Sequence, residues 1–142
     1  MLDIRPVSPD RFVLYENAAY AGGVTVYRTD DAFSIGILIV PAKRRQGLAL
    51  EALRQIAAAY FDAGFALCRN FVAPENAASI RLHERAGFAR AGSASIDGKP
   101  ALIFEKRAPG PSVVQHPLDD EPRARLRLVV YLADVLSDDA QA

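Results

Sequence analysis

The sequence predicts an α/β fold of the α+β type, and three observations lead to this class. Two apolar runs, over residues 33–40 and 66–72, flank a segment with helical periodicity. A strand–helix–strand unit of this kind pairs its strands in parallel through a right-handed crossover. Farther along the chain, Asp97-Gly98 separates two alternating apolar segments, which is a strong signal for an antiparallel hairpin. The predicted sheet is therefore mixed.

The N-terminal part predicts three further strands, over residues 2–7, 12–15 and 24–27. Gly22 and Gly23 suggest a bulge at the start of the third of these. The strand predicted over residues 33–40 is apolar on both faces from Ile35 onward. This pattern is typical of a strand in the middle of a sheet that is covered on both faces.

Two helices are predicted after these strands. Residues 47–63 form the longer one, and its expected buried face consists of Leu53, Ile56, Ala57, Tyr60 and Phe61. Gly64 is suited to end it in the left-handed conformation. The shorter helix has Asn76 as its N-cap and Gly87 just beyond its end, which places Phe88 against Leu82 or His83.

The composition bounds the possible functions. The chain has 142 residues, of which 51% are hydrophobic and 24% charged, as expected for one globular domain. Because 17 basic and 17 acidic residues cancel, non-specific nucleic-acid binding is not favoured. Cys68 is the single cysteine, and its apolar strand predicts a core residue rather than a nucleophile. Without a signal sequence or an apolar run of membrane-spanning length, we expect a cytoplasmic protein that does not bind membranes.

An anion site is predicted at the connection between a strand and the following helix, over residues 40–49, V-P-A-K-R-R-Q-G-L-A. The first turn of a helix leaves backbone N–H groups unpaired and carries the positive end of its dipole. Gly47 has no side chain to hinder an anion, and three cations, Lys43, Arg44 and Arg45, precede it. The alternative is an ordinary solvated basic turn, and the spacing alone does not decide between the two.

Two blocks of sequence together resemble the GNAT superfamily of N-acyltransferases. Arg44-Arg45-Gln46-Gly47-Leu48-Ala49 fits the family's acyl-CoA-binding pattern, Arg/Gln-x-x-Gly-x-Gly/Ala. Residues 72–88, with Asn76, Ser79 and a closing Gly87-Phe88, look like the second half of its signature. The resemblance is closest to branches that acetylate ribosomal-protein N-termini, polyamines or small amine toxins. It implies a mostly antiparallel twisted sheet with a central parallel strand pair, flanked by helices, and acetyl-CoA as cosubstrate.

The resemblance also implies where coenzyme A lies. The sheet would be split near the end of the strand at residues 33–40, and pantetheine would pair there with the main chain of Ile39 and Val40. Backbone N–H groups at this strand end would stabilise the oxyanion. The diphosphate would rest on the turn formed by Arg44, Arg45, Gln46, Gly47, Leu48 and Ala49. Asn76, and more weakly Ser79, would contact the pantetheine arm, although capping the helix is a competing use of the Asn76 side chain.

His83 occupies the position of the tyrosine that many relatives use to protonate the departing thiolate. We therefore expect His83 to be the catalytic acid, with a helix-end histidine packed on Phe88 as the alternative. A general base is not evident, because residues 34–40 contain no carboxylate. Glu16, Glu75 and Tyr27 are the remaining candidates, and deprotonation through water needs none of them.

The sequence departs from the family at its N-terminus. Relatives place two helices between the first two strands, where they wall the acceptor site, and there is no room for them before Phe12. The predicted organisation is an acyltransferase domain over residues 1–107, a proline-rich linker over 108–118 and a C-terminal extension over 119–142. We expect a helix at 121–136, with a strand as the alternative. The segment after Pro117, or a partner subunit in a homodimer, would then cover the exposed sheet face.

The expected activity is transfer of an acetyl group from acetyl-CoA to a primary amine, by direct attack in a ternary complex. The acceptor would be a small-molecule amine or a peptide N-terminus, and no metal or redox cofactor is implied. The alternative is an acyl-CoA-binding or degenerate module that has a regulatory or assembly role and no turnover. The missing acceptor wall and base favour this alternative, and a histidine at the acid position opposes it.

Overall fold

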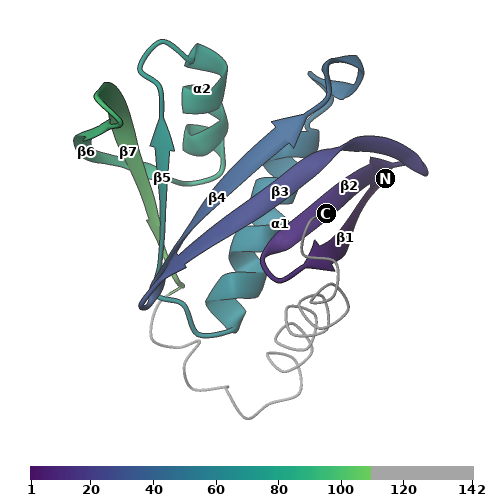
Figure 1. The fold of residues 1–142 in the computed structure, drawn as a ribbon, viewed down its shortest axis with the longest axis horizontal. Coiled ribbons are helices and arrows are strands. Elements are labelled where there is room, and N and C mark those ends of the chain that lie inside the picture. The colour runs from purple at the N-terminus through teal and green to yellow at the C-terminus, as the bar shows by residue number, and fades with distance from the viewer. Residues whose placement is uncertain (110–142) are drawn as a thin grey trace.

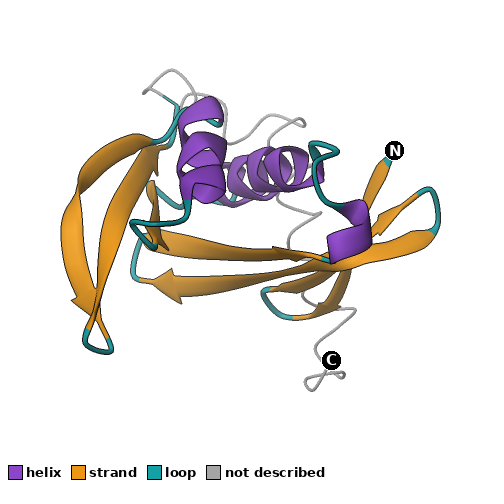
Figure 2. Cartoon of the chain, turned by 90° about the horizontal axis from the view of Figure 1, so that it is seen from above, coloured by secondary structure: helices purple, strands orange, loops and turns teal. Residues whose placement is uncertain are grey.

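A seven-stranded mixed sheet carries two α-helices on one of its faces in the computed structural model, which describes residues 1–109 (Figures 1 and 2). The elements are β1 (Leu2–Ser8), β2 (Arg11–Glu16), β3 (Ala19–Thr29), β4 (Ala32–Ile39), α1 (Leu48–Asp62), β5 (Leu67–Val72), α2 (Ala77–Arg85), β6 (Ala89–Ile96) and β7 (Lys99–Arg107). The strand order is β1-β2-β3-β4-β5-β7-β6, in which the β4–β5 pair is parallel and the other pairs are antiparallel. The predicted fold class is confirmed.

The α1 helix follows the sequence prediction closely. It begins after Gly47, and its predicted apolar face is buried against the sheet. At its end Gly64 adopts a φ of 114°, and the N–H of Phe65 donates to the carbonyl of Tyr60 at 3.1 Å. This is the Schellman arrangement that a glycine at this position allows. The ring of Phe33, at the start of β4, stacks on Tyr60 with 5.0 Å between centroids, which fixes the end of the helix to the sheet.

The α2 helix is also capped as expected. The Asn76 side chain accepts a hydrogen bond from the N–H of Ser79 at 3.0 Å. Gly87 has a φ of 90°, and the N–H of Phe88 donates to the carbonyl of His83 at 2.9 Å. The Phe88 ring then packs edge-on against the His83 ring, with 5.2 Å between centroids. The expected contact between these two residues is confirmed.

Tight turns join β6 to β7 and β1 to β2. Asp97 and Gly98 have φ values of 52° and 79°, as the predicted hairpin requires. Only Pro9 and Asp10 connect β1 to β2, which confirms that no helices intervene there. Asp10 also accepts a hydrogen bond from the Tyr60 hydroxyl at 2.6 Å, so this short turn is tied directly to α1.

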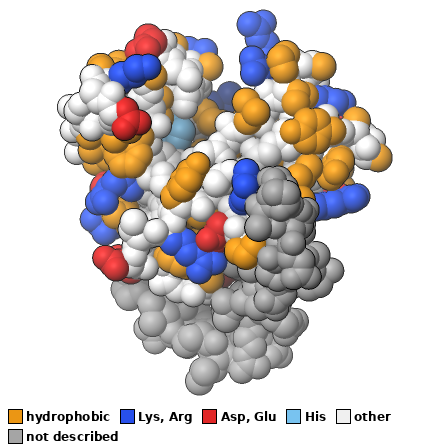
Figure 3. Space-filling model, in the orientation of Figure 1, with side chains coloured by type: hydrophobic (Ala, Val, Ile, Leu, Met, Phe, Trp, Pro, Cys, Tyr) orange, Lys and Arg blue, Asp and Glu red, His pale blue; other side chains and the backbone are white. Residues whose placement is uncertain are grey.

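One face of the β1–β4 part of the sheet lacks a helix within residues 1–109. Both helices lie on the opposite face (Figure 2), and hydrophobic side chains gather on the bare one (Figure 3). Tyr20, Tyr27 and Leu38 are 54%, 62% and 62% exposed. The inference that β4 is covered on both faces is therefore wrong for the described residues. The apolar pattern of β4 reflects its central place in the strand order, and the β1–β2 connection contains no helix that could cover this face.

The C-terminal predictions fall largely outside the described residues. The strand β7 ends at Arg107, and the N–H of Ala108 donates to the carbonyl of Ala66 at 2.9 Å. The rest of the predicted linker and the extension over residues 119–142 lie beyond that point. Among the described helices, none has the length and apolar character to cross a membrane.

Candidate functional site

The parallel strands β4 and β5 diverge soon after they begin to pair. Their ladder consists of two residue pairs, Ala32 with Leu67 and Phe33 with Cys68. Beyond these pairs β4 keeps its partner β3 on one side and loses β5 on the other, so the two strands splay apart toward their carboxyl ends (Figure 1). The split expected near the end of β4 thus begins much closer to its start.

Hydrogen bonds identify which main-chain groups of β4 face the opening. The N–H of Ile35 donates toward β5, to the Asn70 side chain at 2.8 Å, whereas the N–H of Val40 donates to Ala21 on β3 at 2.8 Å. Because alternate residues of a strand direct their main-chain groups to the same edge, Ile37 and Ile39 face the opening together with Ile35. The N–H of Ile39 thus faces the opening, although its carbonyl accepts a hydrogen bond from Arg44 Nε, whereas the N–H of Val40 is engaged with Ala21.

The turn between β4 and α1, where the sequence predicts an anion site, contains two left-handed residues and leads into a helix N-terminus. A short 3₁₀ helix, Pro41–Lys43, leads into it, and Arg45 and Gly47 both adopt left-handed conformations, with φ of 65° and 79°. The first intrahelical bond runs from the N–H of Glu51 to the carbonyl of Gly47 at 3.1 Å, so the earlier N–H groups of α1 have no intrahelical partner. Apart from Gly47 itself and its two chain neighbours, no residue has an atom within 4 Å of the place where a Cβ on Gly47 would stand, so an anion can approach the backbone.

The three cations of this turn have different surroundings. Lys43 Nζ forms an ion pair with Glu16 at 3.1 Å, and Arg44 Nε donates to the carbonyl of Ile39 at 2.8 Å, which fastens the turn to β4. Arg45 is exposed and has no hydrogen bond or ion pair within the described part of the chain, as is also true of Gln46. Arg45 is thus available to a bound anion, as are the terminal guanidinium N–H groups of Arg44, which is exposed and forms no ion pair within the described residues.

His83 is buried between α2 and the sheet, with 7% of its surface exposed. Its ring lies against Phe88 and, at 5.5 Å between centroids, against Phe104. The ring atom Nδ1 lies 2.8 Å from the carbonyl oxygen of Ser79, and Nε2 lies 3.0 Å from Asn70 Nδ2. Both ring nitrogens therefore have partners inside the protein.

These contacts determine the tautomer of His83. A backbone N–H can only donate, so the Asn70 atom that meets the N–H of Ile35 is the oxygen Oδ1. The amide nitrogen of Asn70 then faces His83 Nε2 and donates to it, which leaves the ring proton on Nδ1, where it is donated to Ser79. Burial lowers the pKa of His83, and the hydrogen bond to Ser79 opposes this shift only in part. The ring is neutral near pH 7.

The other candidate residues lie in varied places. The side chain of Asn76 is used as a helix cap, and Ser79 contributes its carbonyl oxygen to His83. Glu16 is held by Lys43 and lies 3.7 Å from the N-terminal amino group. Glu75 is exposed, and Tyr27 lies on the bare face of the sheet.

Sequence reasoning missed Asn70, which joins His83 to β4. A signal for it exists, because an asparagine at the centre of the apolar strand predicted over residues 66–72 is a buried polar group that needs partners. What the sequence does not give is the identity of those partners, since they lie 35 residues before it and 13 after it.

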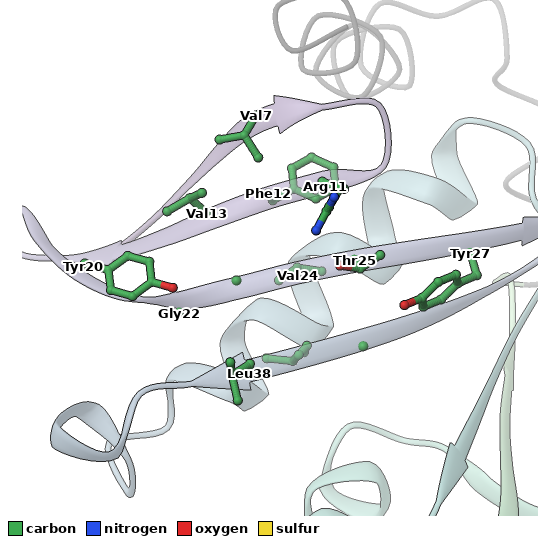
Figure 4. A pocket seen from close by; sticks show the side chains of 13 residues that line it. Val7, Arg11, Phe12, Val13, Tyr20, Gly22, Val24, Thr25, Tyr27 and Leu38 are labelled. Carbon is green, nitrogen blue, oxygen red and sulfur yellow. The ribbon is translucent and has the colours of Figure 1, made fainter. Parts of the chain in front are cut away.

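An open groove of about 460 Å³ crosses the bare face of β1–β4 (Figure 4). Its lining includes Val13, Tyr20, Thr25, Tyr27 and Leu38, with Arg11 as its charged member and no carboxylate. Among the described residues no cluster of three or more His, Cys, Asp or Glu side chains is able to hold a metal ion.

The solved structures that share this fold include three acetyltransferases. The aminoglycoside acetyltransferase AAC(6')-Ib in complex with coenzyme A and kanamycin superposes with a TM-score of 0.63 at 20% identity, over 74% of this chain and 68% of that chain. A mutant form of the spermidine/spermine N-acetyltransferase SpeG from Vibrio cholerae gives 0.62 at 20% identity, over 69% and 66%. The ribosomal-protein-S18-alanine N-acetyltransferase from Escherichia coli gives 0.62 at 26% identity, over 70% and 69%. The matches at 20% identity show the fold alone.

The family of this chain is identified by comparison of its sequence with family models. Comparison with curated proteins finds no match. A family model described as an acetyltransferase (GNAT) domain, however, matches residues 7–89, which is more than half of the chain and includes the anion-site turn and His83. The chain therefore belongs to the GNAT acetyltransferase family.

Proposed function

We propose that the protein transfers an acetyl group from acetyl-CoA to a primary amine, by direct attack within a ternary complex. The observation that carries this proposal is the adjacency of two features at the end of β4. The edge of β4 faces no neighbouring strand beyond Phe33. The turn that contains Arg45 and the N-terminus of α1 follow directly after this strand. An elongated cosubstrate with a diphosphate at one end and amides along its arm suits both features.

In this proposal the diphosphate of coenzyme A lies on the turn from Arg44 to Ala49, where Arg45 and the unpaired N–H groups of α1 stabilise its charge. The pantetheine amides pair with the edge of β4. We assign this pairing to Ile37 and Ile39 in preference to Val40, because the N–H of Val40 is donated to Ala21. Asn76 keeps its role as helix cap.

The amine nitrogen attacks the thioester carbonyl carbon and forms a tetrahedral oxyanion, which main-chain N–H groups on the edge of β4 stabilise. The C–S bond then breaks, the thiolate takes up a proton, and the amine gives one up to water. As the acid of this step, His83 would have to carry a proton on Nε2, which in the resting protein accepts a hydrogen bond from Asn70. The acceptor is a small-molecule amine or a peptide N-terminus.

Two measurements test the proposal. Acetyl-CoA should bind in calorimetry, and free thiol should appear when a panel of polyamines, amino acids and peptide N-termini is added. Arg45→Glu should weaken binding of coenzyme A at least tenfold, because it replaces attraction to the diphosphate by repulsion. Arg90→Glu makes the same charge change on the edge strand β6 and should leave binding unchanged. Absence of binding to the wild-type protein would refute the proposal.

A second candidate function is a GNAT domain that binds acyl-CoA without turnover, in a regulatory or assembly role. The neutral, doubly hydrogen-bonded state of His83 favours it, because such a ring has no proton to give at Nε2. Tight binding of acetyl-CoA without thiol release from any amine of the panel would support this second function.

A further inference from the structure

Asn70 stands at the point where the β4–β5 ladder ends. The parallel register pairs Ala32 with Leu67 and Phe33 with Cys68, and if it continued it would place Ile35 opposite Asn70. Instead of a backbone bond, the side-chain oxygen of Asn70 receives the N–H of Ile35 at 2.8 Å. The side chain thus replaces the next rung of the ladder and holds β4 away from the main chain of β5.

The same amide also reaches α2. Asn70 is 2% exposed, and its Nδ2 donates to His83 Nε2 at 3.0 Å. Its oxygen also lies 3.4 Å from the Ser34 hydroxyl. One side chain therefore connects three elements, β4, β5 and α2, at the closed end of the opening. A buried amide with both ends engaged is costly to displace, because either end would lose its partner without reaching water.

We propose that Asn70 is a positioning residue for acetyl transfer, which sets the opening between β4 and β5 and keeps His83 as a neutral ring protonated on Nδ1. This inference rests on the proposed function, since it assigns Asn70 to the thioester end of the same site. It explains why β4 and β5 part after two residue pairs, and why a histidine at the acid position faces a donor.

The hydrogen bond between Asn70 and His83 excludes the acidic form of His83. A proton on Nε2 would point at the amide hydrogens of Asn70, so the imidazolium exists only after one of the two side chains has turned. No carboxylate takes part in these contacts. Two titratable groups lie close by: the Cys68 thiol, whose sulfur lies 3.6 Å from Asn70 Oδ1, and Lys106, which interacts electrostatically with Cys68 and donates to the carbonyl of Ala86. Burial raises the pKa of Cys68 to about 12, so it stays a neutral thiol. Release of a proton from His83 is therefore coupled to movement of Asn70.

The substitution Asn70→Asp tests this directly, because an ionised aspartate keeps an oxygen for the N–H of Ile35 and presents an acceptor to His83 in place of the amide donor. Long-range ¹H–¹⁵N NMR spectra report the tautomer of each histidine. In the wild type we expect His83 to be protonated on Nδ1, with a pKa below the ordinary value for histidine because the ring is buried. In the variant we expect a proton on Nε2 and a pKa raised by about 1–3 units, as for a histidine that gains a carboxylate partner.

The control is Asn17→Asp, the same change in the turn between β2 and β3, which should leave His83 unaltered. A variant whose His83 keeps its tautomer and pKa would overturn the proposal. If the buried carboxylate prevents folding, the wild-type spectrum still decides, since an Nε2–H tautomer there is incompatible with donation from Asn70. The tautomer and pKa of His83 can be measured without coenzyme A or turnover, so this proposal can be refuted independently of the proposed function. If Asn70 positions His83 for catalysis, the pH profile of kcat/KM should shift to higher pH in Asn70→Asp and stay unchanged in Asn17→Asp. A profile that does not shift in Asn70→Asp would refute this role.

Discussion

Glu16 and Lys43 form an ion pair with 3.1 Å between Oε1 and Nζ, and it joins the end of β2 to the 3₁₀ helix that precedes the anion-site turn. The pair is partly buried, with side-chain exposures of 17% and 24%. It places a negative charge beside the proposed diphosphate site and occupies one of the three cations there. Glu16 is therefore better suited to hold the turn than to act as a free base.

The first prediction concerns Glu16→Gln. We expect coenzyme A to bind about two- to fivefold more tightly at low salt, because Lys43 is released and a repulsive charge is removed. Calorimetry at low and high salt measures the change, and Asp3→Asn on β1 is the charge-matched control. A tenfold loss of turnover with unchanged binding would instead identify Glu16 as the general base.

The second prediction concerns Gly47→Ala. Gly47 has a φ of 79°, so an alanine there should lower the free energy of unfolding by about 1 kcal/mol, and its methyl group should also hinder the anion. Gly98 is a matched control, because it has the same φ and equally open surroundings in the β6–β7 turn. Urea denaturation should show similar losses for both variants, whereas calorimetry should show weaker binding of coenzyme A for Gly47→Ala alone. Equal binding by the two variants would argue against a diphosphate on this turn.

Features that depend on close neighbours in sequence were predictable. The caps at Asn76, Gly64 and Gly87 and the Asp97-Gly98 turn each follow from a few adjacent residues, because turn and cap geometry is set locally. The strand–turn–helix arrangement around residues 40–49 was predictable for the same reason.

Features that depend on distant residues were not predictable in the same way. The contact of Glu16 with Lys43 spans 27 residues and that of Asn70 with Ile35 spans 35, so both depend on how strands are ordered in the sheet. The resemblance predicted where His83 lies in the site, but it did not predict the hydrogen bonds of its ring. The pattern of β4 predicted a sheet covered on both faces. This prediction was wrong for the described residues, because an apolar strand carries no information on whether a covering element exists.

The third prediction concerns the pH dependence of stability. The pKa of His83 is lowered in the folded protein, so between that pKa and about 6.5 the unfolded chain binds a proton that the folded chain does not. The free energy of unfolding should therefore rise with pH across this window, by at most about 1.4 kcal/mol per pH unit. Urea denaturation between pH 5 and 7 should show a smaller slope for His83→Gln than for the wild type. Equal slopes would mean that His83 titrates alike in both states.

The fourth prediction concerns the bare face of β1–β4. The described chain ends near the β3–β4 turn, because Ala108 is bonded to Ala66 and the following Leu67 pairs with Ala32 at the start of β4. We expect the apolar stripe of the predicted helix, which includes Leu128, Leu132, Val135 and Leu136, to cover the groove. Deletion of residues 110–142 should then expose Tyr27 and Leu38 and cause association, measurable by light scattering.

The matched control for this deletion is the same truncation with Leu38→Lys, which should restore a monomer because a charge interrupts the exposed apolar patch. In the full-length chain, Leu38→Lys should instead lower the melting temperature, since it places a charge beneath the covering segment. A truncated protein that stays monomeric and active would show that residues 110–142 do not cover the groove. Association of the full-length wild type through this face would assign the covering role to a second copy of the chain.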